Sequence, residues 1–409
     1  MSEVVHIPQL RFSEFSGEWE EKPYGENYRF LITNSFSRDK LNYDFGEVKN
    51  IHYGDIHTKF KTLFDMSIET VPFINDDVDI SRIDNDNYCQ VGDLVVADAS
   101  EDYGDIGKTI EIVNLDLKKT LAGLHTFLVR PMGNSISIGF MGNLLKSWKV
   151  RKQVMTVAQG SKVLGLSKTN LSKIKISLPT KPEQQKIAAF LTEVDNKIEQ
   201  LSKKQELLGE YKKGAMQQIF SQAIRFKADD GSDFPDWKEN KVDEFMEVTR
   251  GQVLAVPEMR QVESEIFKYP VYSSQTKNNG LTGYYTDYLF EDCITWTTDG
   301  ANAGDVNYRA GKFYCTNVCG VLRSKKGYAN LCIAQILNSV SRRYVSYVGN
   351  PKLMNNVMEK IKISIPSSIN EQTKIANFLS SVDSKIEEVG KQLDESKQFK
   401  KALLQKMFV

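Results

Sequence analysis

Residues 173–220 read KIKISLPTKPEQQKIAAFLTEVDNKIEQLSKKQELLGEYKKGAMQQIF, and residues 360–408 read KIKISIPSSINEQTKIANFLSSVDSKIEEVGKQLDESKQFKKALLQKMF. The same stretch therefore occurs twice in a chain of 409 residues. From Glu183 and Glu371 onward the two copies keep a constant offset of 188, and 17 of the next 38 positions are identical. Because a repeat of this kind means that one structural unit is used again, the sequence predicts two equivalent halves.

Each copy predicts a short strand followed by a long helix. KIKIS alternates polar and apolar residues, as a strand does, and Pro179 or Pro366 ends it. Apolar residues then recur every seven positions, which predicts a coiled-coil seam interrupted by Gln205, Lys212, Ser396 and Lys400. The alternative is that each helix packs only on its own domain. The residues expected to pair the helices are Phe190, Leu191, Val194, Ile198, Leu201, Leu208, Phe378, Leu379, Val382, Ile386, Val389 and Leu393.

A globular segment precedes each strand and helix. Both segments begin near an Arg-Phe pair and then reach Trp19 or Trp237, but between these anchors they share little identity. Their runs of β-branched and aromatic residues between Gly and Asp turns favour strands. We therefore expect an α+β fold, with two strand-rich α/β domains joined and spaced by two long antiparallel coiled-coil helices under a pseudo-two-fold repeat. The predicted boundaries are 1–178 and 222–365 for the globular domains, and 179–221 and 366–409 for the helical regions.

The formal net charge of zero hides an uneven distribution. Residues 117–182 contain no Asp or Glu but twelve Lys or Arg, and residues 306–358 are also free of acids and carry eight Lys or Arg. Residues 65–116 hold fourteen acids. One basic stretch alone indicates a solvated face, whereas two at matching places in a repeat favour binding to a polyanion.

Several classes of function find no support in the sequence. None of the 26 glycines is followed by another two residues on, and no phosphate-binding loop motif occurs. The four histidines all lie in the first third, and Cys315 with Cys319 lacks the second pair of a zinc site. We expect no catalytic residue, metal or cofactor on this chain. The odd number of cysteines, the absence of a signal peptide and the lack of a long apolar run predict a cytoplasmic protein without a membrane segment.

Polar and aromatic side chains in turn-rich segments are the remaining candidates for function. Asn, Gln, Arg and Lys read base edges, and Ser, Thr and Lys anchor phosphates. A Gly-led basic turn precedes each KIKIS strand, at residues 159–168 and 349–355, and each is also explained as an ordinary surface loop. The residues predicted to contact DNA are His52, Tyr53, His57, Lys59, Lys108, Lys162, Ser167, Lys168, Ser273, Ser274, Gln275, Lys277, Asn278, Thr297, Thr298, Asn302, Tyr308, Arg309, Lys352 and Asn355.

Over essentially its whole length the chain resembles a specificity subunit of a type I DNA restriction–modification system. The resemblance rests on the pattern I-x-[LI]-P…E-Q-x-K-I-A-x-F-L-x-x-V-D-x-K-I-E, which occurs at residues 176–199 and again at 363–387. It implies two target-recognition domains, each reading one half of a split, asymmetric site in double-stranded DNA. It also implies that the conserved helices set the spacer and dock two methyltransferase subunits.

The same resemblance places the chemistry on other subunits. The two methyltransferase (M) subunits would carry S-adenosylmethionine and methylate adenine, and two restriction (R) subunits would use ATP and Mg²⁺. This chain would be a non-catalytic reader. Two alternatives remain: a self-contained DNA methyltransferase or nuclease, and a coiled-coil scaffold with two protein-binding domains.

Overall fold

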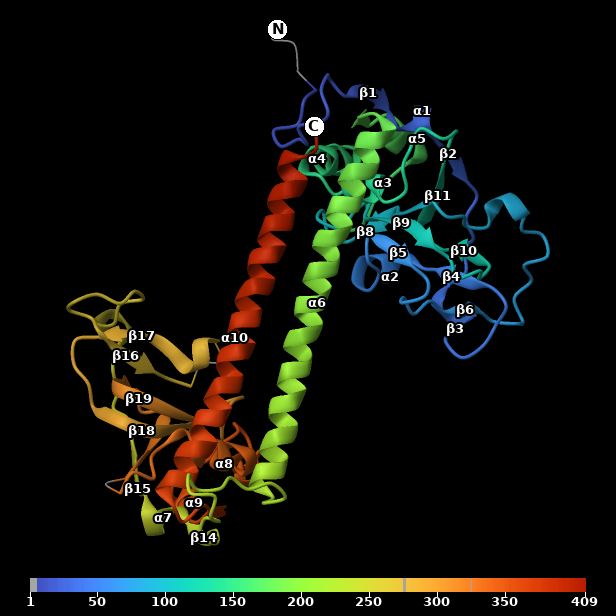
Figure 1. Cartoon of the computed structure of the whole chain (residues 1–409). Coiled ribbons are helices and arrows are strands. Elements are labelled where there is room, and N and C mark those ends of the chain that lie inside the picture. The colour runs from blue at the N-terminus through green and yellow to red at the C-terminus, as the bar shows by residue number, and fades with distance from the viewer. Residues whose placement is uncertain (1–5, 275–276, 325) are drawn as a thin grey trace. The chain divides into compact units, whose positions relative to one another are not determined.

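The computed structural model of the chain describes residues 6–274, 277–324 and 326–409. The chain divides into two compact units. Unit 1 consists of Met1–Lys203 together with Gly390–Val409, and unit 2 consists of Lys204–Val389. The division falls inside the two long helices, α6 (Lys181–Phe220) and α10 (Ile369–Lys406), so each unit contains one part of each helix (Figure 1).

Unit 1 is rich in short strands. A five-stranded sheet has the order β2-β11-β7-β9-β5, a four-stranded sheet has the order β10-β4-β6-β3, and two ribbons pair β1 with β13 and β8 with β12. The strands are β1 (Glu20–Pro23), β2 (Tyr28–Leu31), β3 (Leu41–Asn42), β4 (Lys49–Ile51), β5 (Leu63–Asp65), β6 (Phe73–Ile74), β7 (Leu94–Ala97), β8 (Ala99–Ser100), β9 (Thr109–Asn114), β10 (Thr120–Ala122), β11 (Thr126–Pro131), β12 (Leu164–Gly165) and β13 (Lys175–Leu178). The short helices are α1 (Tyr24–Asn27), α2 (Tyr53–Thr58), α3 (Phe140–Leu144), α4 (Trp148–Val157) and α5 (Lys168–Ser172), with 3-10 turns at Arg38–Lys40 and Asn85–Asn87.

Unit 2 is built around one six-stranded sheet with the order β15-β20-β18-β19-β16-β17, and a separate ribbon pairs β14 with β21. The strands are β14 (Lys238–Lys241), β15 (Glu247–Arg250), β16 (Tyr269–Tyr272), β17 (Leu281–Tyr285), β18 (Phe290–Thr297), β19 (Val306–Cys315), β20 (Cys319–Arg323) and β21 (Lys362–Ile365). The helices are α7 (Val242–Phe245), α8 (Leu331–Ser341) and α9 (Asn355–Met358), with 3-10 turns at Val256–Glu258, Lys277–Gly280 and Arg342–Tyr344.

The long helices run antiparallel within each unit. In unit 1, Leu191 near the start of α6 shares a buried cluster with Leu403 and Met407 near the end of α10. In unit 2, Ile219 at the end of α6 shares a cluster with Leu379 near the start of α10. All twelve residues predicted to pair the helices are buried or half-buried. The predicted fold class is confirmed, and the four-part domain division remains a prediction.

A matching clamp fixes the start of each long helix. In unit 1, Arg11 donates from Nε and Nη2 to the two carboxylate oxygens of Glu183, both at 2.7 Å, and Trp19 Nε1 donates to Oε1 at 3.3 Å. In unit 2, Arg225 donates to both oxygens of Glu371, at 3.1 and 2.9 Å. Both carboxylates are buried. The phenylalanine of each Arg-Phe pair also packs on the long helix, Phe12 on Phe190 and Phe226 on Phe378, so both pairs hold the starts of these helices.

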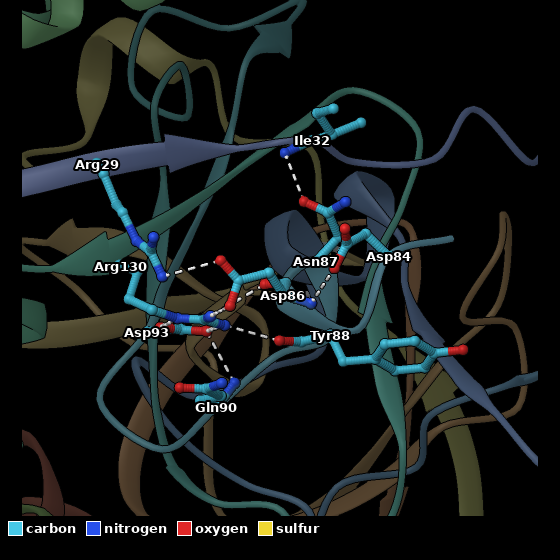
Figure 2. Close-up of polar contacts among 9 residues, drawn as sticks. All are labelled: Arg29, Ile32, Asp84, Asp86, Asn87, Tyr88, Gln90, Asp93 and Arg130. Carbon is cyan, nitrogen blue, oxygen red and sulfur yellow. Dashed lines mark hydrogen bonds and ion pairs between the residues drawn. The ribbon is translucent and has the colours of Figure 1, made fainter. Parts of the chain in front are cut away.

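A second ion-pair network uses part of the acidic segment (Figure 2). The guanidinium of Arg130 donates to both oxygens of Asp93, at 2.8 and 2.7 Å, and to the carbonyl of Tyr88 at 2.7 Å. Arg29 pairs with Asp86 at 3.2 Å. Since these carboxylates are neutralised within unit 1, residues 65–116 present less negative charge to a partner than their composition indicates.

Among the residues that the structure describes, no helix is long and apolar enough to cross a bilayer.

Candidate nucleic-acid interface

Unit 1 brings the ring of the sequence-distant His125 next to three rings of α2 and its N-cap, those of His52, Tyr53 and His57. The Tyr53 ring lies 4.7 Å from that of His52, 5.9 Å from that of His57 and 5.2 Å from that of His125, between ring centroids. His125 also faces Asp98 at 3.3 Å, and burial raises the pKa of that carboxyl. Three of the rings belong to predicted DNA-contact residues. Sequence reasoning missed His125, although its place in a Gly-Leu-His-Thr turn was a usable signal.

His52 itself is a structural residue, which corrects its prediction as a DNA contact. It is 7% exposed, and its Nδ1 accepts a hydrogen bond from the backbone of Gly54 as the cap of α2. Burial and the neighbouring Arg38 lower the pKa of His52 to about 4, so the ring is neutral at pH 7. One ring nitrogen of His57 also has a partner within the unit, because Nε2 lies 3.0 Å from the carbonyl oxygen of Ala99.

Two lysines, Lys59 and Lys108, contact α2 beside this aromatic cluster, and Lys162 and Lys168 lie on the later turn and helix of the same unit. Lys59 pairs with Asp55 at 2.9 Å and reaches the hydroxyl of Tyr43 at 3.0 Å. Lys108 donates to the carbonyl of His57, which ties it to α2. Lys168 is exposed at the start of α5, with its Nζ 5.9 Å from the ring centre of Phe127. Ser167 caps α5 by accepting from the Asn170 backbone at 3.1 Å, and Lys162 is exposed on the preceding turn.

In unit 2 the loop after β18 packs against the basic turn before α9. Gly300 N donates to the carbonyl of Pro351 at 3.0 Å, and Lys352 Nζ lies 3.7 Å from Asp299. Asn302 is half-buried on the same loop, and Asn355 donates to the carbonyl of Thr249 at 3.3 Å. The structure therefore brings Asn302 and Lys352 to one loop pair. Tyr347, on the same turn and 70% exposed, was not predicted from the sequence.

The loop pairs of the two units share one backbone pattern despite their different sequences. Three backbone hydrogen bonds of unit 1 have counterparts in unit 2. In unit 1 they are Gly107 N to Ala97 O (3.1 Å), Asp98 N to His125 O (3.0 Å) and Leu166 N to Asp98 O (2.8 Å). Their counterparts in unit 2, in the same order, are Gly304 N to Thr297 O (2.9 Å), Thr298 N to Val318 O (3.1 Å) and Leu353 N to Thr298 O (2.9 Å). The turns carrying Lys162 and Lys352 are thus held in the same way in both units. The sequence places these two turns at matching points of the repeat, but the match of the loops after β7 and β18 lies in backbone hydrogen bonds and no side-chain pattern indicates it.

Several predicted contacts in unit 2 are buried and need correction. Thr298 is 0% exposed and donates to the carbonyl of Val318 at 2.9 Å, and Thr297 is 8% exposed. Arg309 is 9% exposed; it donates to Thr295 Oγ1 at 3.1 Å and lies 3.8 Å over the ring of Tyr272. Thr297 and Arg309 are held inside the sheet by their positions on β18 and β19, and Thr298 is buried on the loop that follows β18. These three side chains therefore lack the exposed polar groups that the predicted contacts require.

The remaining predicted contacts lie at two places: Ser273, Ser274 and Asn278 lie between β16 and β17, and Tyr308 lies on β19. Ser273 Oγ accepts from Thr316 Oγ1 at 3.0 Å, and Tyr308 donates to Asp292 at 3.2 Å. Ser274 is half-buried, and Asn278 is exposed with a left-handed φ of 51°. Gln275 and the side chain of Lys277 lie outside the described residues.

The thiols of Cys315 and Cys319 are buried and free, and burial raises the pKa of Cys319 to about 11. Among the described residues no group of three or more His, Cys, Asp or Glu is placed to hold a metal ion.

The family model and the relatives that this chain matches agree on one family. Residues 46–208 and 235–395 both match the type I restriction modification DNA specificity domain. A Mycoplasma pneumoniae protein described as a candidate type I specificity subunit N-terminus is 37% identical over 146 residues, covering 35% of this chain and 75% of that protein. Two further relatives from that organism, each 35% identical, are matched over 45% and 38% of their own length.

Longer matches are more distant. A candidate specificity subunit of the MjaX type I restriction enzyme of Methanocaldococcus jannaschii is 23% identical over 98% of this chain and 95% of its own. A crystal structure of a type I restriction–modification S subunit from M. genitalium has a TM-score of 0.65 at 16% identity, covering 98% of this chain and 99% of that one. At this identity the structural match establishes the fold.

Proposed function

The chain belongs to the type I restriction–modification DNA specificity domain family, and from this premise we propose that each of its units reads one half of a split DNA site. The observation that carries the proposal is the recurrence of one backbone loop pair in both units with different side chains on it. A shared scaffold with different side chains is what two different half-sites require, because base edges are read by side chains.

We further propose that α6 and α10 set the spacer between the half-sites and dock two methyltransferase subunits. Two restriction subunits would join that complex for cleavage. S-adenosylmethionine would then be bound by the methyltransferase subunits, and ATP with Mg²⁺ by the restriction subunits. The chain itself would be a non-catalytic reader acting in the cytoplasm. The pairing of α6 with α10 within each unit supports a defined length for this spacer.

Exchange of one recognition segment tests this proposal. Residues 237–366 are replaced by the corresponding segment of a relative, and the chain is expressed with its methyltransferase partner. Sequencing of methylated adenines is expected to show one half-site changed and the other retained. The reciprocal exchange of residues 19–179 is the matched control, and it should alter the other half-site.

Two results would contradict the proposal. A change in both half-sites after one exchange would show that the units do not read independently. Absence of any sequence-dependent DNA binding or methylation by the unaltered complex would favour the scaffold alternative.

Lysines on the two equivalent turns are expected to contact phosphates. Lys162→Ala or Lys352→Ala should weaken DNA binding of the chain with its partner by roughly 3- to 10-fold, and lower the salt slope by about one. Sequence preference should not change, since phosphates carry no base identity. Binding is measured by titration at several salt concentrations.

The matched control is Lys362→Ala on β21. Lys362 is exposed like Lys352, and it also has a carboxylate partner, Glu239 at 3.5 Å. The control variant should bind as the unaltered chain does. An equal loss in the control, or DNA binding that is indifferent to salt, would contradict the assignment of these turns.

A further inference from the structure

Two lysines that interrupt the apolar seam have symmetric partners. Lys212 of α6 lies 2.6 and 2.8 Å from the carboxylate oxygens of Asp383 on α10, within unit 2. Lys400 of α10 pairs in the same way with Asp195 on α6, within unit 1. Lys212 and Lys400 are equivalent at the offset of 188, and so are Asp195 and Asp383. The two ion pairs therefore occupy equivalent positions in the two copies of the repeat.

These pairs are sheltered by comparison with ordinary surface pairs. The exposed fraction of the side chain is 21% for Lys212 and 15% for Lys400, and 37% for each aspartate. By contrast, Lys391 and Glu395 on the outer face of α10 are 79% and 64% exposed and lie 3.9 Å apart. Charges shielded from water interact more strongly than exposed ones, so the inner pairs have a larger effect on which alignment of the helices is stable.

A parallel alignment of the same two helices would place these four charges differently. The helix sequences are so alike that a parallel pairing at the offset of 188 would place equivalent apolar residues side by side. In that pairing Asp195 would meet Asp383, and Lys212 would meet Lys400. Only the antiparallel alignment joins each lysine to an aspartate. Polar residues at single seam positions select register in coiled coils in this way.

We propose that the pairs Lys212–Asp383 and Asp195–Lys400 determine the antiparallel orientation and register of the two helices. The apolar seam stabilises the parallel and antiparallel pairings to a similar degree, whereas the four charges destabilise the parallel and shifted alignments. This inference deepens the proposed function, because the register of α6 against α10 would be what fixes the DNA spacer.

Exchanges of charge within one helix test the inference at constant composition and net charge. The α10 exchange is Asp383→Lys with Lys400→Asp, which places like charges together in the antiparallel alignment. The α6 exchange is Asp195→Lys with Lys212→Asp and has the same consequence. The combined exchange of all four residues restores two opposite-charge pairs. The matched control, Lys391→Glu with Glu395→Lys, exchanges the exposed pair on the outside of α10.

Thermal unfolding of the full chain with its methyltransferase partner gives the first readout. Each single-helix exchange should lower the first unfolding transition by roughly 5 °C or more, while the control should change it little. The combined exchange should recover most of the loss. Recovery is expected to be incomplete because Lys146 interacts electrostatically with both Asp195 and Lys400. Unfolding of the single exchanges like the unaltered chain, or failure of the combined exchange to recover, would overturn the proposal.

Adenine methylation in cells gives a second readout that separates this inference from the proposed function. Methylation of the split site should fall in each single exchange and return, with the original spacer, in the combined one. If the stability pattern holds but the unaltered complex methylates no split site, the proposed function fails and the orientation role stands. If methylation is normal in all variants while stability follows the pattern, the pairs do not set the spacer and the link to function is overturned.

Discussion

Gly320→Ala is expected to destabilise unit 2 by more than about 3 kcal/mol, a typical upper cost for a forced overpacking in a closed core. Gly320 on β20 lies directly opposite Trp296 on β18. A Cβ at position 320 would come within 2.1 and 2.2 Å of two carbons of the indole ring. The ring cannot move aside easily, because it is 0% exposed and its Nε1 donates to the carbonyl of Leu353 at 2.9 Å.

The expected loss is measured by chemical unfolding followed through tryptophan fluorescence. Gly209→Ala in α6 is the control, because a Cβ there meets nothing within 4 Å. Alanine is a better helix former than glycine, so the control should be stabilised by up to about 1 kcal/mol. If Gly320→Ala unfolds at the same denaturant concentration as the unaltered chain, the close packing of Trp296 against β20 is wrong. Since Trp296 holds Leu353, the variant should also loosen the turn that carries Lys352.

Glu183→Ala is expected to cost about 3–5 kcal/mol, the usual range when one partner of a buried ion pair is removed. Glu183 is 1% exposed and accepts from Arg11 and Trp19 at the start of α6. Without the carboxylate, the guanidinium of Arg11, whose side chain is only 13% exposed, keeps its charge in a place shielded from water. Glu371→Ala should behave similarly in unit 2, where Arg225 is left without its partner.

The loss is measured by thermal unfolding, with Glu14→Ala as the control. Glu14 pairs with Lys186 at 3.3 Å, but both side chains are about half exposed, so its removal should leave the unfolding temperature unchanged. Replacing Arg11 and Glu183 together by leucine should recover part of the loss, since no charge is then left buried but Trp19 Nε1 loses its acceptor. Equal unfolding temperatures for Glu183→Ala and Glu14→Ala would show that the clamp does not hold the helix.

The sequence predicted the helical frame well because that information is local. Heptads and the KIKIS alternation depend on neighbours one to seven residues away, and α6 and α10 form where these patterns lie. The anchors Arg11 and Trp19 were recognised as repeated, but their common partner Glu183 was not. That contact spans more than 160 residues, and no short-range pattern encodes it.

The candidate site was predicted only in part. Lys162 and Lys352 are exposed on turns and Lys168 is exposed at the start of α5, whereas Arg309 is buried in β19, Thr298 on the loop after β18 and His52 at a helix cap. Residue type and turn composition do not indicate which face of a strand a side chain occupies, because a shift of one residue reverses the face. The match between the loops after β7 and β18 was also hidden, since backbone hydrogen bonds hold it while the side chains differ.

By itself the sequence determined that one strand-and-helix unit occurs twice, that its helices carry an apolar seam, and that basic residues gather at matching places in the repeat. Only the tertiary structure decided which partners the polar residues in the apolar seam have. Lys212 and Lys400 look like defects in the seam until Asp383 and Asp195 are placed opposite them. The physical reason is that a charge in a seam is stabilised by its partner across the interface, and that partner is set by packing rather than by neighbours in the chain.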